Sequence, residues 1–102
     1  MQNYNIFVTS KAQMDLATYV GFVLQVSKDA ALSLANDFEQ LMNSLRTYPE
    51  RNPSFQTPRS FPFDVRKQIV NGRYIILYSI EKTNVVVYRI LDSRRKFDQL
   101  LN

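Results

Sequence analysis

Residues 70–97 restrict the fold of this chain more than any other stretch; their sequence is V-N-G-R-Y-I-I-L-Y-S-I-E-K-T-N-V-V-V-Y-R-I-L-D-S-R-R-K-F. Two apolar runs rich in β-branched and aromatic residues flank a short polar turn at residues 81–84, which is typical of two antiparallel strands. Asn71-Gly72, just before the first run, is a strong signal for a tight hairpin turn after an extended segment. The pattern therefore predicts three consecutive strands, at residues 65–70, 74–80 and 85–91.

The N-terminal quarter of the chain predicts one strand and one helix. Residues 3–8 indicate a strand with an apolar face. Ser10 then offers a hydroxyl N-cap, and Gln13 three residues later completes a capping-box pattern. From residue 11 to about residue 25, apolar side chains recur at helical spacing, so this segment is predicted to be the first helix.

A second helix is predicted to follow directly. Ser27 is its expected N-cap, and Asp29 lies in the first turn, where the helix dipole favours negative charge. Tyr48-Pro49 should end this helix, because proline disfavours helical geometry in the residue before it. Residues 49–62 hold all four prolines and show no periodicity, which predicts an ordered loop. The apolar face of the second helix is expected to consist of Ala31, Leu34, Phe38, Leu41 and Leu45.

These elements follow the order strand, helix, helix and three strands. Two helices that arrive together pack on one face of a mainly antiparallel sheet. The sequence therefore predicts an α+β fold, in which a two-helix antiparallel hairpin packs on a mostly antiparallel four-stranded sheet whose opposite face stays at least partly open. The length of 102 residues and the hydrophobic content of 45% suit one domain over residues 1–102.

The composition excludes several kinds of site. Cysteine is absent, so there is no disulfide framework and no thiolate metal site. Histidine is also absent, which removes the usual general base and the commonest metal ligand. No apolar run is long enough to cross a bilayer, and the N-terminus lacks the pattern of a signal peptide. We therefore expect a cytoplasmic protein without cofactor, metal ion or membrane partner.

Positive charge is concentrated in the C-terminal part of the chain. The net charge is +4, and residues 59–102 hold nine Lys and Arg against four Asp and Glu. Within eight residues at the end of the last predicted strand lie Arg89, Arg94, Arg95 and Lys96. Several guanidinium groups at one edge of a sheet suit phosphate or carboxylate, so we expect a nucleic acid or an acidic protein as partner.

Each charged group also has an ordinary structural interpretation. Basic residues at a strand exit are often simply solvated, and Arg73 could contact phosphate or only flank a turn. For Arg89 we favour a structural role, with Glu81 or Asp92 as its partner across the sheet. Three further carboxylates are predicted to be solvated on helix surfaces: Asp15, Asp37 and Glu39.

The order of these features resembles the RelE/ParE superfamily of bacterial toxins. The similarity covers essentially the whole chain, beginning at Y-N-I-F-V-T-S-K-A-Q-M-D-L and continuing through L-R-T-Y-P-E-R-N-P. It is strongest in R-Y-I-I-L-Y-S-I and in V-V-V-Y-R-I-L-D-S-R-R-K-F. The resemblance implies the toxin of a type II toxin–antitoxin module, silenced by a cognate acidic antitoxin. The alternating apolar face that holds Tyr74 and Tyr78 is then either core against the helices or a groove in which these tyrosines anchor the antitoxin, and both can hold.

Two modes of action are open within this superfamily. RelE-like members cleave mRNA on the ribosome, whereas ParE-like members poison DNA gyrase. The matches to the RelE-like site are partial: Arg66 and Arg94 match, Arg73 is displaced by two residues, and Phe97 cannot carry a proton. We therefore favour the ParE-like mode slightly, and a member without toxicity is a third alternative. The catalytic candidates for a nuclease are Arg66, Arg73 and Arg94, and the candidates for target or phosphate binding are Arg94, Arg95 and Lys96.

Overall fold

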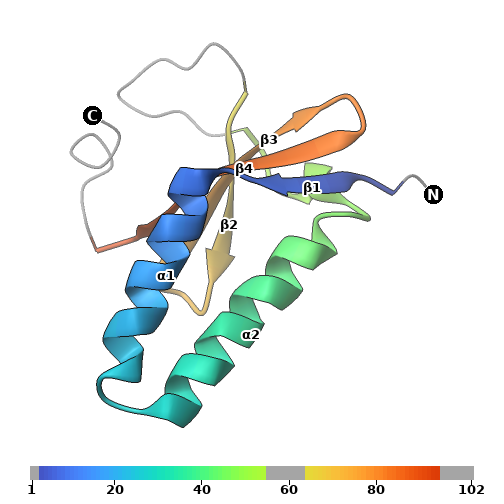
Figure 1. Ribbon diagram of the computed structural model, residues 1–102. Helices are drawn as coiled ribbons and strands as arrows, with labels where there is room; N and C mark the ends of the chain where they lie inside the picture. Colours follow the sequence, from blue (N-terminus) through green and yellow to red (C-terminus); the bar gives the residue numbers. More distant parts are fainter. Residues whose placement is uncertain (1–2, 55–63, 95–102) are drawn as a thin grey trace.

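The computed structural model describes residues 3–54 and 64–94 of the chain (Figure 1). All six predicted helices and strands are present, in the predicted order. A short 3₁₀ helix, η1, is added in the part of the loop that the structure describes. The elements are β1 (Asn5–Val8), α1 (Ser10–Leu24), α2 (Lys28–Ser44), η1 (Pro49–Arg51), β2 (Arg66–Val70), β3 (Tyr74–Glu81) and β4 (Asn84–Asp92).

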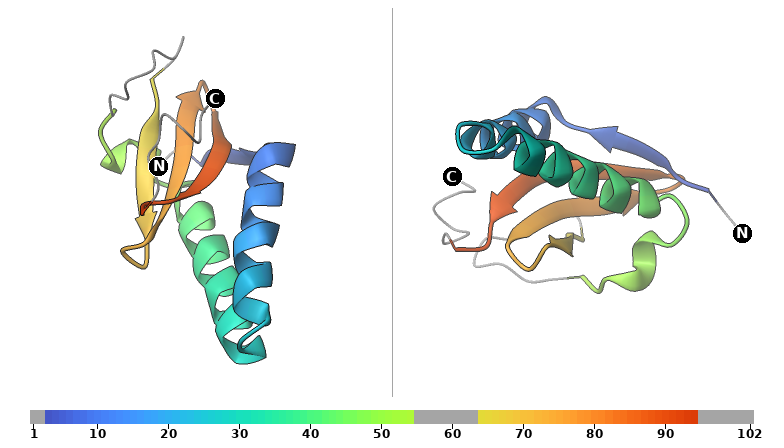
Figure 2. Two further views of the ribbon diagram at one scale, coloured as in Figure 1. Left: turned by 90° about the vertical axis from the view of Figure 1, so that its left-hand side faces the viewer. Right: turned by 90° about the horizontal axis from the view of Figure 1, so that it is seen from below.

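The four strands form one sheet in the order β1-β4-β3-β2. β2 pairs with β3 and β3 with β4 in antiparallel fashion, whereas β1 runs parallel to β4. The two helices form an antiparallel hairpin that lies on one face of this sheet and extends past its edge (Figures 1 and 2). The predicted α+β architecture with a mostly antiparallel four-stranded sheet is therefore confirmed.

Residues with a positive φ make both hairpin turns tight. Asn71 and Gly72 have φ angles of 54° and 68°, and the amide of Arg73 donates to the carbonyl of Val70 at 3.1 Å. Two consecutive residues with positive φ are typical of the turn that matches the twist of paired strands. The predicted Asn-Gly hairpin is thus confirmed. In the turn between β3 and β4, Lys82 has a φ of 59°.

The start of α1 lies one residue earlier than the capping pattern predicted. Thr9, not Ser10, is the N-cap: its hydroxyl accepts from the amide of Ala12 at 3.1 Å and donates to the carbonyl of Tyr88 at 2.9 Å. Gln13 donates instead to the carbonyl of Val8, so the capping box on Ser10 is wrong. Thr9 is favoured because the same hydroxyl caps the helix and binds α1 to β4. This second contact is not visible in local sequence.

The second helix begins as predicted and ends earlier. The hydroxyl of Ser27 accepts from the amide of Ala30, which confirms the N-cap. The helix ends at Ser44 rather than at Tyr48-Pro49. The amides from Leu45 to Thr47 bond to carbonyls three residues back, which winds the chain more tightly than an α-helix. This winding frees the Arg46 carbonyl to accept from the amide of Tyr4 at 2.8 Å, so the end of α2 is tied to the start of β1.

The core lies between the helical hairpin and the sheet. Phe38 of α2 is fully buried, and its ring lies 5.3 Å from that of Tyr74 on β3. Ile75 and Leu77 point to the opposite side of β3 and are also buried. The two-sided apolar pattern of this strand is thus explained, and the open sheet face that we expected does not extend over β3. The core cluster consists of Tyr4, Ala12, Leu34, Phe38, Leu45, Val70, Tyr74, Ile76, Tyr78, Val85, Val87 and Ile90.

A partly buried ion pair fastens α1 to the end of β4 that lies beyond its pairing with β1. β1 pairs with β4 only as far as Val87, so the following part of β4 has no strand partner on that side among the described residues. Asp15 of α1 fills this place: its carboxylate accepts from the amide of Ile90 at 2.9 Å and from the Arg89 guanidinium at 2.8 and 3.0 Å. The structural role predicted for Arg89 is supported. Its predicted partners, Glu81 and Asp92, are wrong, and so is the prediction of a solvated Asp15.

Candidate functional site

The end of β4 meets the turn between β2 and β3 at one corner of the sheet. In the strand register Tyr74 lies opposite Asp92, and the amide of Ser93 donates to the carbonyl of Arg73 at 2.7 Å. This pairing brings two of the predicted site residues to the same carboxylate. Arg94 donates to Asp92 through Nε and Nη2, at 3.1 and 2.8 Å, and Nη2 of Arg73 lies 3.5 Å from Asp92 Oδ2. We call Arg73, Asp92 and Arg94 the arginine corner.

Asp92 is the buried member of the arginine corner and positions both arginines. Its side chain is 6% exposed, whereas the side chains of Arg73 and Arg94 are 46% and 65% exposed. Hydrogen bonds from the Arg94 side chain, a further bond from its amide and the charge of both guanidiniums lower the pKa of Asp92 to about 2, against the opposing effect of burial. One ionised carboxylate thus holds two cations, and the corner carries a net positive charge.

The stability of the fold should depend on pH through Asp92. A native pKa of about 2 lies below the ordinary value of 3.8, so the native state favours the ionised form. The stabilisation of the folded state by ionised Asp92 is complete above about pH 5. It disappears as the pH falls through 2, because Asp92 is then protonated in both the folded and the unfolded state. Since the two arginines reach solvent, we expect about 1–2 kcal/mol. Urea unfolding between pH 2 and 5 should show this loss of unfolding free energy in the native chain and not in Asp92→Asn. If the unfolding free energies of the two proteins fell equally with pH, the role of Asp92 would be contradicted.

A crevice separates the arginine corner from the helical hairpin. A cavity of about 250 Å³ is lined by Arg73, Tyr74, Asp92 and Arg94 on the sheet side and by Tyr19, Phe22 and Val23 on α1. A second cavity, of about 320 Å³, continues past Arg73 and Tyr74 towards α2. The guanidinium of Arg73 lies 5.0 Å from the centre of the Tyr74 ring, which positions it beside aromatic surface. The site therefore combines exposed cations with an apolar wall.

Arg66 does not join the arginine corner. It lies opposite Tyr78 at the far end of β2, four register positions from the Val70–Tyr74 pair, which is about 13 Å along a strand. Its guanidinium donates to the backbone carbonyls of Asn52 and Glu50. Of the three nuclease candidates, the structure thus brings Arg73 and Arg94 together and leaves Arg66 apart. Two other predicted cations, Arg95 and Lys96, lie outside the described residues, as does Phe97.

Tyr74 and Tyr78 are not available as antitoxin anchors. They are 4% and 0% exposed, because both face the helical hairpin and belong to the core. The hydroxyl of Tyr78 donates to the carbonyl of Pro49 at 2.7 Å, which fixes η1 against β3. This burial against the chain's own helices supports a core role for both tyrosines, and Tyr74 reaches only the edge of the crevice beside the arginine corner.

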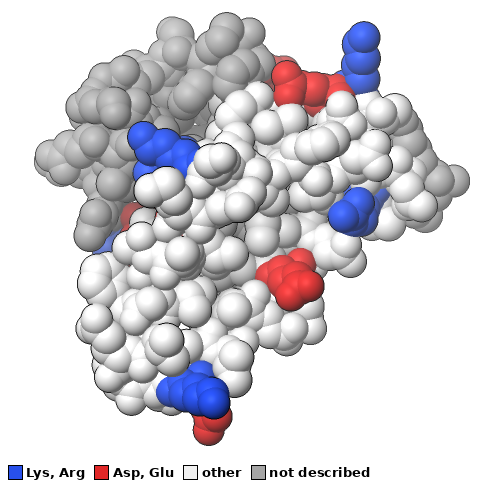
Figure 3. Space-filling view, viewed as in Figure 1, with Lys and Arg blue, Asp and Glu red and all other residues white. Residues whose placement is uncertain are grey.

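The face that carries the helices shows few charged side chains, and acidic and basic groups are scattered over it (Figure 3). α1 and α2 together hold two lysines, Lys11 and Lys28. Against these stand the four carboxylates Asp15, Asp29, Asp37 and Glu39. The predicted concentration of positive charge in the C-terminal part is thus not continued by a basic stripe along the two helices.

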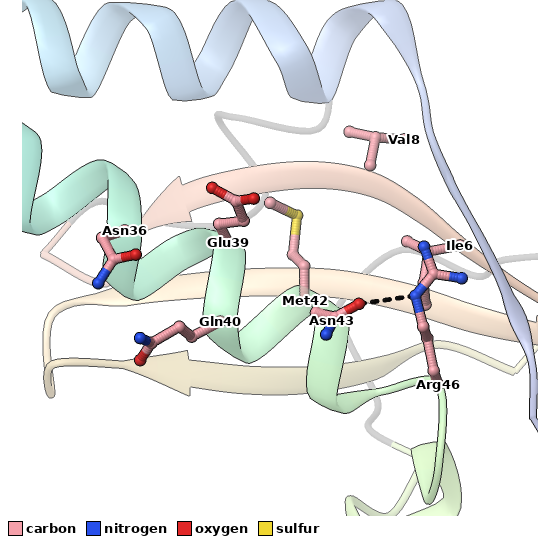
Figure 4. Close-up of a pocket in the computed structure, with 8 residues that line it drawn as sticks. All are labelled: Ile6, Val8, Asn36, Glu39, Gln40, Met42, Asn43 and Arg46. Atoms are coloured by element: carbon pink, nitrogen blue, oxygen red, sulfur yellow. Dashed lines mark hydrogen bonds between the residues drawn. The ribbon is translucent and has the colours of Figure 1, made fainter.

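A groove on the helical side was not predicted from the sequence. It has a volume of about 430 Å³ and lies between β1 and the C-terminal half of α2. Figure 4 shows the side chains around it: Ile6, Val8 and Met42 supply apolar surface, and Arg46 donates to Asn43 at 2.7 Å on the rim. Its other lining residues are Asn36, Glu39 and Gln40. The groove adjoins an edge strand, since β1 is the last strand of the sheet on this side.

Two kinds of feature are absent from the described part of the chain. No helix there has the length and apolar character needed to span a bilayer. Nor do its Asp and Glu residues gather in a group of three that could hold a metal ion.

A family model described as the ParE toxin of the type II toxin–antitoxin system parDE matches residues 6–97. The chain belongs to the ParE toxin family. The resemblance to the RelE/ParE superfamily is thereby confirmed for nearly the whole chain. Comparison with curated protein sequences gives no significant match.

Two solved structures share the ParE-like fold. One is from the chromosomal ParDE toxin–antitoxin system of P. aeruginosa: it is 19% identical, the match covers 87% of this chain and 95% of that chain, and the TM-score is 0.68. The other is the solution structure of a conserved hypothetical protein from Helicobacter pylori, which is 12% identical, with 90% and 97% of the two chains covered and a TM-score of 0.54. At these low sequence identities, the two structural matches show a common fold.

Sequence reasoning missed two features of this ParE family member. The first is Asp92, whose position two residues before Arg94 allows one carboxylate to bind both the side chain and the amide of that arginine. This spacing was visible in the sequence and could have indicated the arginine corner. The second is the groove beside β1, which forms only because α2 and β1 meet through the Tyr4–Arg46 contact. No local sequence pattern predicts that contact.

Proposed function

We propose that this ParE family protein is a cytoplasmic toxin that arrests bacterial growth by binding DNA gyrase, and that a cognate acidic antitoxin neutralises it. Family membership carries the first part of the proposal. The target is supported by the chemistry of the arginine corner, whose three side chains offer charge without proton transfer.

The arginine corner suits binding better than RNA cleavage. Cleavage at a 2′-OH requires a group that removes a proton and another that supplies one. Asp92 remains ionised above pH 2 or so, and guanidiniums stay protonated, so none of the three corner residues exchanges protons near neutral pH. The remaining basic candidate, Arg66, lies at the other end of β2 and is bound to backbone carbonyls. This separation is the observation that favours a binding toxin over a ribosome-dependent mRNA endoribonuclease.

Induction of the protein in bacteria tests the proposal directly. Gyrase poisoning predicts altered plasmid supercoiling and trapped gyrase–DNA complexes, with messages intact by primer extension. Cut messages would favour the endoribonuclease alternative instead. Normal growth, together with the absence of a co-purifying acidic protein, would argue that this member has no toxin activity.

Arg94→Ala should relieve growth arrest. Its guanidinium is the more exposed cation of the arginine corner, and losing one charge-assisted contact should weaken target binding by roughly tenfold or more. Colony counts after induction measure this effect, with circular dichroism as the check on folding. Lys11→Ala removes an exposed cation from the start of α1 and serves as the matched control. Equal toxicity of Arg94→Ala and the native chain would remove Arg94 from the site.

The groove between β1 and α2 is the proposed antitoxin site, in place of Tyr74 and Tyr78. An apolar floor of Ile6, Val8 and Met42 inside a polar rim suits an amphipathic segment, which buries its apolar residues and leaves its polar ones at the rim. The groove shares no lining residue with the arginine corner, so the antitoxin can bind the groove with one segment and cover the corner with another segment of the antitoxin chain.

A further inference from the structure

We propose that the crevice beside the arginine corner binds an acidic, amphipathic segment of a partner protein. A carboxylate of this segment bridges Arg73 and Arg94, and an apolar side chain next to it packs on Phe22 of α1. The inference deepens the proposed function and rests on it, because it names the chemistry of the partner that the arginine corner receives. It does not depend on which cellular protein supplies the segment.

The first argument is the charge left over at the arginine corner. Asp92 neutralises one positive charge, and two guanidiniums face it. Arg94 uses Nε and Nη2 for Asp92, and Arg73 uses Nη2, so Nη1 of each arginine is outside these contacts. A second carboxylate placed between the guanidiniums would complete an alternating arrangement of two cations and two anions. Such charge-assisted bonds are among the stronger contacts that a protein surface can offer.

The second argument is that the arginine corner is prepared for a ligand in advance. Asp92 is buried, accepts from the amide of Arg94 and thereby restricts the arginine next to it. On the other side, stacking on Tyr74 restricts Arg73. Guanidiniums that are already positioned lose less conformational entropy on binding than free surface side chains. The corner is therefore better suited to a specific carboxylate than an ordinary exposed pair of arginines.

The third argument is apolar surface that adjoins the cations. Phe22 lines the crevice and is 59% exposed. Beyond it, Leu24, Val26 and Leu32 are exposed at the end of the helical hairpin, which extends past the sheet in Figure 1. A cluster of large exposed apolar side chains on a small protein usually marks an interaction surface. Because Phe22 belongs both to the crevice and to the exposed apolar side chains of this hairpin, we expect the ligand to carry apolar residues beside its acidic ones.

The distribution of charge favours a protein over a nucleic acid. Phosphate binding by nucleic-acid proteins relies on basic residues spread along a surface that follows the backbone. Here the helical wall of the crevice belongs to a hairpin with more carboxylates than lysines, and charges on that side are scattered (Figure 3). On the helical side, which the structure describes, a nucleic acid leaving the arginine corner would meet acidic and apolar surface. A short acidic segment needs only the corner and Phe22.

Peptide binding to the full chain tests this inference. The probe is a fluorescein-labelled twelve-residue peptide in which glutamates alternate with leucine and phenylalanine, and its partner peptide carries glutamine in place of every glutamate. We expect binding of the acidic peptide by fluorescence anisotropy, with at least about tenfold weaker binding of the glutamine peptide. In ¹⁵N-labelled protein, the amide shifts should be largest at Phe22, Val23, Arg73 and Arg94. Shifts confined to the groove beside β1 would overturn the proposal.

Variants distinguish peptide binding in the crevice from attraction by the net charge of the protein. Phe22→Ser changes an exposed side chain and should weaken the acidic peptide several-fold without affecting the fold. Arg73→Gln with Arg94→Gln would leave Asp92 buried and unpaired, so Asp92→Asn is added in a triple variant, which should lose the peptide at least tenfold. Lys11→Gln with Lys82→Gln removes two exposed cations elsewhere, at the start of α1 and in the turn between β3 and β4, and should bind normally.

Three results would count against the inference. Equal loss of binding in the lysine variant and the triple variant would show attraction by net charge alone. Tighter binding of a single-stranded oligonucleotide than of the acidic peptide at 150 mM salt would assign the corner to nucleic acid. A dimer in light scattering that dissociates in Phe22→Ser would assign the apolar surface to a second copy of the chain. Because these measurements do not involve growth arrest, a protein that binds the peptide and is harmless would contradict only the proposed toxicity.

Discussion

Replacing Asp15 with alanine is expected to lower the free energy of unfolding by about 3–5 kcal/mol. The side chains of Asp15 and Arg89 are only 14% and 16% exposed, so the change leaves a largely buried guanidinium without its carboxylate. It also removes the acceptor of the Ile90 amide, at a part of β4 where no described strand takes its place. Urea unfolding followed by circular dichroism would measure the effect.

Two comparisons show which contact carries the loss of stability. Asp15→Asn retains an acceptor for the Ile90 amide and should lose less stability than Asp15→Ala. Asp37→Ala removes a helix carboxylate whose bond is to the exposed Asn71 side chain, and should cost less than about 1 kcal/mol. Adding Arg89→Met to Asp15→Ala should restore part of the stability, because the cation that Asp15 balanced is gone. Similar losses for Asp15→Ala and Asp37→Ala would contradict the role given to Asp15.

The second large effect should appear in neutralisation by the antitoxin. Gln40 is exposed on α2 and lines the groove beside β1, so Gln40→Trp would fill part of that groove without disturbing the core. We expect cells that express this variant to stop growing even when the cognate antitoxin is present. Loss of one well-packed interface contact commonly weakens a complex by about tenfold or more. Pull-down of the antitoxin and colony counts would measure the two effects.

A matched tryptophan distinguishes the groove from the rest of the helical hairpin. Ala17→Trp places the same ring on an exposed position of α1, away from the lining of this groove. The antitoxin should still neutralise that variant. If Gln40→Trp were neutralised as well as the native chain, the antitoxin would have to bind elsewhere.

Periodicity explains why the fold was predictable and the site only in part. The Asn71-Gly72 turn and the apolar runs after it identify a hairpin by local geometry alone, and the spacing from Ala31 to Leu45 identifies α2. These signals depend on neighbours in sequence. Every error concerned a contact between distant residues. Thr9 replaced Ser10 as the cap because it also reaches Tyr88, and α2 ended early where Arg46 meets Tyr4.

The same reasoning separates the predicted site residues. Arg94 was identified from a cluster of charge, and Arg73 from its place beside a turn; both meet at Asp92 because the register of β3 and β4 places them there. Arg66 met the same sequence criteria and lies elsewhere, since β2 runs antiparallel to β3 and carries it to the opposite end. Tyr74 and Tyr78 were assigned to a groove because the sequence does not show which face of β3 the helices cover.

The parallel pairing of β1 with β4 has a consequence for synthesis of the protein. β1 cannot pair until β4 has been synthesised, because Asn5 aligns with Asn84 near the far end of the chain. Contacts this distant close a long loop and slow the approach to the native state. An incomplete chain that stops before β4 therefore lacks a partner for β1, the arginine that holds α1 through Asp15, and the carboxylate between the two cations. Premature stop codons along most of the gene should accordingly yield harmless fragments rather than weakened forms of the protein.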